Sequence, residues 1–299
     1  WSIFNDVQYR HVDYEMNGFQ DNPTLFIRRQ FNFINPKTGI SFNDAKTHAY
    51  LSYALAGKEP NRDDFEAAES EQPKPEFLHD FETGFSKKIN RFSLAATLYY
   101  MLYKDQLVLT GKINQEGSYT RVNVPNSYRL GLEIQAAAKP VDWLEVSANA
   151  TFSRNKIKEF AEYIDNYDDG TQQIIQHSNT DISFSPAVVG ALSIRVQPLK
   201  NISISFDSKY AGKQFLDNTQ NDLRSLDAYF YEDARIVFSP RVNIFSACTF
   251  ILQVNNVFNH VYESNGATYP YLYEGKLVND NYYYPMAGTN FLLGVNVKF

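Results

Sequence analysis

The chain has 299 residues, of which 43% are hydrophobic and 15% aromatic, and its formal net charge is −6. An isoelectric point near 5.4 argues against a nucleic-acid binder, because such proteins present a basic face to phosphates. No stretch approaches the roughly 18 consecutive apolar residues of a transmembrane helix. The single cysteine, Cys248, excludes an intrachain disulfide.

Alternation of apolar and polar residues predicts about twelve strands. The loops between them are long and short by turns. Bacterial outer-membrane barrels have this asymmetry, with tight periplasmic turns and long extracellular loops. The pattern therefore predicts an all-β, antiparallel transmembrane barrel. The strands are expected near 1–15, 27–42, 47–57, 77–88, 91–108, 125–138, 143–157, 184–197, 201–214, 225–239, 244–258 and 286–299.

The alternation gives each predicted strand one apolar and one polar face. In residues 143–153, for example, Leu144 and Phe152 fall on one face and Glu145 and Asn149 on the other. The strands exceed the five or six residues typical of globular sheets and are long enough to cross a bilayer with tilt. We therefore expect the apolar faces to contact lipid and the polar faces to line a wet lumen. A soluble β-sandwich lectin, with the apolar faces turned inward, is the alternative.

Six segments occur in an order that is typical of one family. The segment 128–133 carries Gly-x-Glu, and Lys58 stands where many family members have arginine. The chain ends on the aromatic Phe299. Together these features resemble the C-terminal half of the barrel of a TonB-dependent outer-membrane receptor. The six segments are 33–42 (Phe-Ile-Asn-Pro-Lys-Thr-Gly-Ile-Ser-Phe), 49–62, 75–84 (with Pro-Glu and Glu-x-Gly), 99–107, 128–133 and 254–262 (Val-Asn-Asn-Val-Phe-Asn-His-Val-Tyr).

The resemblance implies a 22-stranded barrel with a plugged lumen in the bacterial outer membrane. Residues 1–299 would be its last twelve strands, and the plug domain, the TonB-contacting segment and the first ten strands would lie outside this chain. An open sheet leaves unpaired backbone groups at both edges, and each costs several kcal/mol or so in hydrocarbon. We therefore expect other strands of the same receptor to complete the barrel.

The implied function is import of a scarce nutrient, with energy delivered by the TonB complex through the plug. The family commonly carries iron chelates, so a siderophore or haem is the expected cargo. A SusC-like glycan or peptide importer with a surface lipoprotein, or a cobalamin receptor, is the alternative. Neither covalent chemistry nor a cofactor is implied. An outer-membrane hydrolase is disfavoured, because the scattered histidines offer no Ser/His/Asp constellation.

Candidate ligand contacts lie in the long loops. A tyrosine ring with its hydroxyl suits stacking on a catecholate, a corrinoid or a sugar, and the arginines suit an anion. Alternatively, the tyrosines pack the loop or anchor the barrel at the lipid headgroups, and the arginines are only solvated. The candidates are Arg62, Tyr119, Arg121, His177, Tyr269, Tyr271, Tyr273 and Tyr283.

A second set of candidates is charged and lies in mid-strand. These side chains are expected either to hydrogen-bond the plug or to pair with each other across neighbouring strands. No metal site is expected, because the histidines lack ligand spacing. The run 165–170 echoes part of a calcium loop but lacks the glutamate at the twelfth position, which favours a hydrated turn. The lumen candidates are Arg129, Glu133, Arg195, Asp233 and Arg235.

Overall fold

A computed structural model of the chain describes residues 1–18, 23–66, 72–113, 119–241 and 244–299. Among these residues, no helix is long and apolar enough to cross a membrane. Twelve strands form one antiparallel sheet in which each strand pairs with the next of the series. They are β1 (Ser2–Asn17), β2 (Phe26–Asn43), β3 (Thr47–Lys58), β4 (Glu76–Ile89), β5 (Phe92–Ile113), β6 (Tyr119–Val141), β7 (Leu144–Asn166), β9 (Val188–Leu199), β10 (Ile202–Ala211), β13 (Tyr229–Phe238), β14 (Ala247–Asn255) and β17 (Asn290–Lys298).

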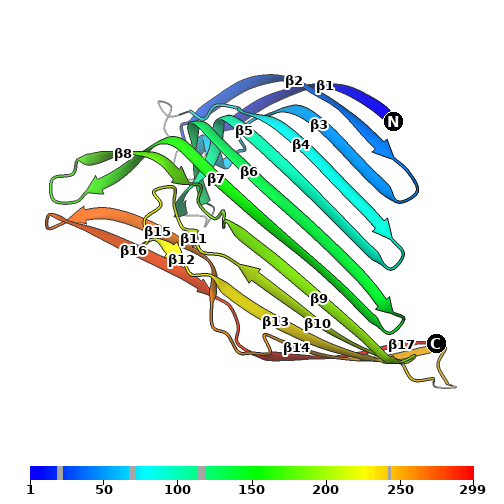
Figure 1. Ribbon diagram of the computed structural model, residues 1–299. Helices are drawn as coiled ribbons and strands as arrows, with labels where there is room; N and C mark the ends of the chain where they lie inside the picture. The colour runs from blue at the N-terminus through cyan, green and yellow to red at the C-terminus, as the bar shows by residue number, and fades with distance from the viewer. Residues whose placement is uncertain (19–22, 67–71, 114–118, 242–243) are drawn as a thin grey trace.

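The sheet curves like part of the wall of a cylinder, with the short turns at one end and the long connections at the other (Figure 1). The predicted all-β antiparallel class is confirmed. Most strand ends lie within four residues of their expected positions, but β5, β6 and β7 extend farther toward the long connections, β7 to Asn166 instead of residue 157. Within the described residues, β1 pairs only with β2 and β17 only with β14. The sheet is therefore open, with one backbone edge free on each side.

The long connections contain strands that the sequence pattern did not predict. The expected loops 158–183 and 259–285 are hairpins: β7 continues to Asn166 and pairs with β8 (Gln172–Asp181), and β15 (Glu263–Tyr273) pairs with β16 (Lys276–Pro285). Both faces of these hairpins are only partly apolar, so the alternation that marks a membrane strand is weak there. The short pair β11 (Gln214–Phe215) and β12 (Ser225–Leu226) and the 3-10 turn η1 (Asp63–Glu66) complete the connections.

Three strands, β9, β13 and β17, start four residues later than expected, and for β9 the reason is local. The prediction placed the beginning of a strand at residue 184, but β9 begins at Val188. Pro186 lacks the N–H that a strand interior needs, and Phe184 has a φ of 50°. The segment 182–186 folds instead against the wall of the sheet, where Arg129 donates to the Ser185 hydroxyl at 3.0 Å.

The two faces of the sheet differ as predicted. Leu132 is 37% exposed and Val295 is 55% exposed, and Val146 and Ile204 are half-buried rather than enclosed. The alternative with an inward apolar face requires these side chains in a dry core, which the structure contradicts. The buried clusters lie instead at the end with the long connections, as in the cluster Val108, Val124, Ile157, Phe160 and Ile182.

Aromatic pairs border the apolar face at both ends. Near the long connections, the ring centroids of Tyr53 and Phe81 are 4.9 Å apart and those of Tyr100 and Tyr128 are 6.2 Å apart. Near the short turns, Trp1 packs against Phe42 with centroids 5.2 Å apart. Aromatic rings at these two levels match the interfacial positions of a membrane barrel.

On the polar face, aromatic rings lie directly over glycines of the neighbouring strand. Tyr50 of β3 is opposite Gly84 of β4, and Tyr99 of β5 is opposite Gly131 of β6. A Cβ atom at Gly84 would be 2.1 Å from the Tyr50 ring, and one at Gly131 would be 2.3 Å from the Tyr99 ring. Only glycine leaves room for this contact.

The assignment of the two faces can be tested with two arginine substitutions at the same depth in the membrane, one on each face. Leu132→Arg in the complete receptor is expected to destabilise the folded barrel by about 2–4 kcal/mol, because a lipid-facing guanidinium loses its hydration. Thr151→Arg, on the polar face beside Glu133, should cost much less. Urea unfolding in detergent micelles, followed by tryptophan fluorescence, measures both. Equal losses would contradict the assignment of the faces.

Candidate ligand-binding surface

Two hairpins join at the end of the sheet that carries the long connections. Tyr271 and Leu272 of β15 pair in parallel with Asp165 and Asn166 of β7. The strand order β8–β7–β15–β16 therefore forms a four-stranded sheet that projects beyond the main wall (Figure 1). We call it the extension.

The tips of the two hairpins are tied together. The carboxylate of Asp168 accepts from the amides of Glu274 at 2.7 Å and Gly275 at 2.8 Å. Beside it, the rings of Tyr167 and Tyr271 stack with centroids 5.0 Å apart. These contacts hold the hairpins in one sheet, although more than a hundred residues separate them in the chain.

The register places most of the extension's tyrosines on one face. Paired residues share a face and successive residues alternate, so Tyr271 faces the same side as Asp165. Tyr167, Tyr273 and Tyr282 are 65%, 51% and 57% exposed. Tyr283 pairs with Gly266 and lies on the opposite face. The exposed side, here named the tyrosine face, carries Tyr163, Tyr167, Tyr269, Tyr271, Tyr273 and Tyr282.

The opposite face of the extension packs on the 212–228 connection through a buried arginine. Arg224 donates to Glu162 of β7, to Asp217 at 2.8 Å and to Asn279 of β16 at 2.6 Å. Burial alone would lower the pKa of Arg224, but the charges of Asp217 and Glu162 and their hydrogen bonds outweigh it and raise that pKa. Glu162 also contacts His177 Nε2 at 2.7 Å. One guanidinium thus joins three connections.

The predicted ligand contacts are therefore distributed over different environments. Tyr269, Tyr271 and Tyr273 share the tyrosine face, whereas His177 points to the buried side with Glu162. Arg121 makes a two-point contact with Asp64, at 2.8 and 2.7 Å, which ties β6 to η1. Arg62 is exposed just before η1. Tyr119 begins β6, and its side chain lies outside the described part.

Sequence reasoning missed Tyr163 and Tyr167, which complete the tyrosine face. Both lie in a segment predicted to be a loop, so the sequence pattern indicated no strand pairing that would place them beside the tyrosines of residues 263–285. The alternation Tyr163, Asp165, Tyr167 against Ile164 was a signal that the strand continues.

The lumen candidates lie on the polar face of the sheet. Arg129 and Glu133 line a recess of about 480 Å³ between the wall and the segment 182–186. Arg195 and Arg235 flank Ser205 on either side by register, and Asp233 accepts from the Asn256 amide at 2.8 Å. In the described part of the chain, no ion pair joins any two of the five candidates.

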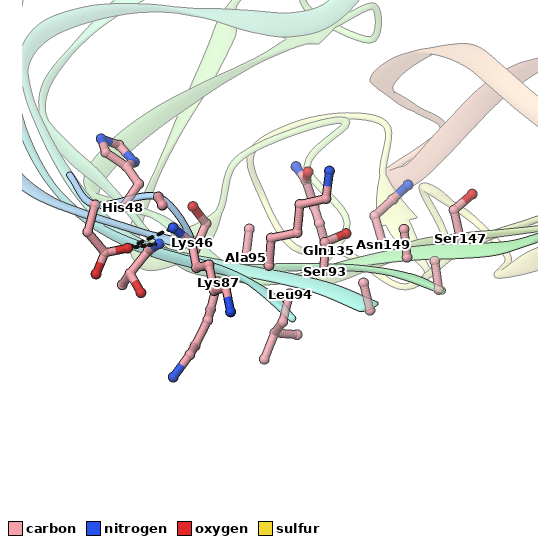
Figure 2. A pocket seen from close by; sticks show the side chains of 17 residues that line it. Lys46, His48, Lys87, Ser93, Leu94, Ala95, Gln135, Ser147 and Asn149 are labelled. Carbon is pink, nitrogen blue, oxygen red and sulfur yellow. Dashed lines mark hydrogen bonds between the residues drawn. The ribbon is translucent and has the colours of Figure 1, made fainter. Parts of the chain in front are cut away.

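A second hollow lies at the end with the short turns. It measures about 390 Å³ and is lined by small side chains such as Ala95 and Ser147 (Figure 2). Figure 2 shows Gln135 and Asn149 on one side of the sheet and Leu94 on the other. At its rim, the amides of the turn 46–47 donate to Asp44 at 2.7 and 2.6 Å, which holds the pKa of that carboxyl below its ordinary value.

The described residues contain no cluster of three or more histidine, cysteine, aspartate or glutamate side chains placed to hold a metal ion. The described residues form a curved sheet with one apolar and one polar face, and the long connections at one end of it contact one another. The sequence matches the family model described as "TonB dependent receptor-like, beta-barrel" over residues 5–259. The chain belongs to this family, and its strands are those of a bacterial outer-membrane barrel. The family consists of receptors rather than enzymes, as the sequence predicted.

Solved receptors share the fold at low sequence identity. The siderophore receptor PiuA from Acinetobacter baumannii superposes with a TM-score of 0.72 at 16% identity, over 99% of this chain and 41% of that one. The closed form of the ferric-catecholate import receptor Fiu from E. coli K12 gives 0.69 at 18%, over 99% and 42%. The copper transporter OprC gives 0.70 at 13%, over 99% and 45%. No curated protein matches the sequence significantly.

The buried arginine provides a test of the interlocked connections. Arg224→Met leaves Asp217 as a buried charge without a counter-ion and Glu162 with only its contact to His177, and breaking a buried ion pair in this way typically costs about 3–5 kcal/mol. We expect faster amide exchange in residues 159–181 and 263–285 of the complete receptor, measured by mass spectrometry, without change in the transmembrane strands. Lys213→Met is the matched control, since Lys213 pairs with Asp222 at the exposed surface. Unchanged exchange in the Arg224 variant would contradict the interlock.

The turn at Asp44 yields a pH dependence. Its folded-state pKa is lowered, so its stabilisation is present above the unfolded pKa, near 3.8, and disappears as the pH falls through the folded value. We expect the protection factors of the Lys46 and Thr47 amides to fall in this acid range. Asp44→Ala should have low protection at every pH. Wild-type amides whose protection equals that of Asp44→Ala above the unfolded pKa would be inconsistent with this cap.

Proposed function

We propose that the chain is the C-terminal part of the barrel of a TonB-dependent importer that carries a scarce nutrient across the outer membrane. The chain spans about two fifths of the solved receptors it resembles. Its two open edges support a barrel completed by further strands of the same receptor, because unpaired backbone groups are too costly in hydrocarbon.

The lumen supports a plug as the partner of the wall. Among the residues that the structure describes, Arg129, Glu133, Arg195 and Arg235 form no ion pairs with one another, which supports a role for their charges in holding a domain inside the barrel. Asp233 retains acceptor capacity beside the Asn256 amide. In this proposal the plug hydrogen-bonds these side chains, and the TonB complex acts on the plug rather than on the wall. No nucleic acid takes part.

An iron chelate, a siderophore or haem, is the proposed cargo. The printed names of the receptors that share the fold include siderophore and ferric-catecholate receptors, which supports this choice. Contact residues are proposed among the loop candidates, with Tyr269, Tyr271 and Tyr273 as the central group because they share one exposed face. Arg62, Tyr119, Arg121, His177 and Tyr283 are proposed as secondary contacts.

The tyrosine face also supports a second candidate. Flat rings beside amide side chains suit a sugar, which is the cargo of a SusC-like importer working with a surface lipoprotein. A cobalamin receptor would likewise use stacked rings. These alternatives predict different growth phenotypes.

Uptake in cells tests the cargo. A strain that lacks the receptor should lose TonB-dependent accumulation of radiolabelled ferric chelates and recover it on complementation. A TonB-deficient strain carrying the receptor is the control and should also fail to accumulate iron. Normal iron uptake in the deletion strain, with growth lost only on a glycan or only under cobalamin limitation, would replace the iron proposal by the corresponding alternative.

A further inference from the structure

The extension is strongly acidic. Its two hairpins, residues 159–181 and 263–285, contain Lys276 as their single lysine and no arginine. Such an excess of negative charge lowers the local concentration of anions and disfavours their binding. The carboxylates are Glu159, Glu162, Asp165, Asp168, Asp169, Asp181, Glu263, Glu274 and Asp280.

The nearby cations offset only part of this charge: Lys158 of β7 and Lys276 of β16 are exposed, against nine carboxylates, and the other two bases are already paired. Arg224, directly behind the tyrosine face, is buried between Glu162 and Asp217. Lys156, below the β7–β8 hairpin, pairs with Asp181 at 2.8 Å. Each of these bases is bound to a carboxylate, so neither provides free positive charge to a ligand on the exposed side.

The tyrosine face itself combines rings, amides, the exposed Lys276, which pairs with Tyr273, and two carboxylates that already have donors. Gln172 of β8 pairs with Asp165 and therefore lies on this face, where its amide donates to the Asp165 carboxylate at 2.8 Å. Asp280 is hydrogen-bonded by the Tyr271 hydroxyl. Ring surfaces and neutral hydrogen-bonding groups remain for a ligand. This surface suits a compact molecule without net charge.

We propose that the tyrosine face selects by charge: it binds an uncharged ligand, such as a neutral ferric trihydroxamate, and disfavours an anionic ferric tris-catecholate. The inference rests on the proposed function, because it concerns the ligand of that same importer. The exposed rings of Tyr167 and Tyr273 cover the apolar surface of the ligand, and their hydroxyls and Gln172 bond its amide groups. Selectivity comes from the carboxylates, which repel an anion.

Two adjacent glutamines provide a matched pair of variants. Both are exposed at the start of β8, but Gln172 lies on the tyrosine face and Gln173 on the opposite one. The complete receptor is purified in detergent, and binding of a neutral ferric trihydroxamate and of a ferric tris-catecholate is titrated at low salt. Gln172→Lys should strengthen tris-catecholate binding about three- to tenfold by adding positive charge, and it should weaken trihydroxamate binding by no more than the loss of one neutral hydrogen bond. Gln173→Lys should have a smaller effect.

A tyrosine variant tests the same face. Tyr273→Ala should weaken trihydroxamate binding about tenfold, whereas Leu277→Ala, on the opposite face of the same hairpin, should change it little. Wild-type binding of the tris-catecholate as tight as that of the trihydroxamate would overturn charge selection while leaving iron import intact. Binding of neither chelate, but of a neutral oligosaccharide with the same sensitivity to Tyr273→Ala, would uphold selection for an uncharged ligand and reject the iron cargo. No binding of any of the three probes would overturn the inference.

Discussion

The structure depends on pairing backbone hydrogen bonds where water is absent. Within a bilayer each N–H and C=O group must find a protein partner, and a series of antiparallel strands provides one for every residue except at the two edges. The chain follows this constraint from β1 to β17, each strand joined to the next. The side chains follow from it, because a sheet between lipid and water must be apolar on one face and polar on the other.

The end beyond the membrane is organised by a different interaction, the burial of charge in pairs. Arg224 pairs with Asp217 of its own connection and with Glu162, 62 residues away in the chain, and Arg121 reaches Asp64 across 57 residues. Removing one partner of such a pair leaves the other charge buried without a counter-ion. Connections that would be mobile separately are therefore held as one body, which gives the tyrosine face a fixed shape.

The sequence predicted the wall well and the extension poorly, for one physical reason. In the wall, lipid demands an apolar residue at every second position, so alternation marks strands such as β6 and β7 almost to their ends. Beyond the membrane both faces of a strand meet water or protein, and β8, β15 and β16 show no such strict pattern. Tyr271 and Tyr273 could be selected by residue type alone, but their partners Tyr163 and Tyr167 require the pairing of β15 with β7, which no local pattern encodes.

The aromatic rings that lie over glycines have a consequence for how the wall assembles and what it encloses. Because the Tyr99 ring packs against Gly131, it projects only a short distance into the lumen and leaves space there for a plug domain. The same fit specifies alignment: a slip of β5 by two residues along β6 would bring Tyr99 opposite Arg129 or Glu133, whose side chains fill the space that the ring needs. Tyr50 over Gly84 imposes the same condition on β3 and β4. The ring-on-glycine contacts of the polar face therefore specify the register between neighbouring hairpins. The lipid-facing residues do not, because that face would be equally apolar after a two-residue slip.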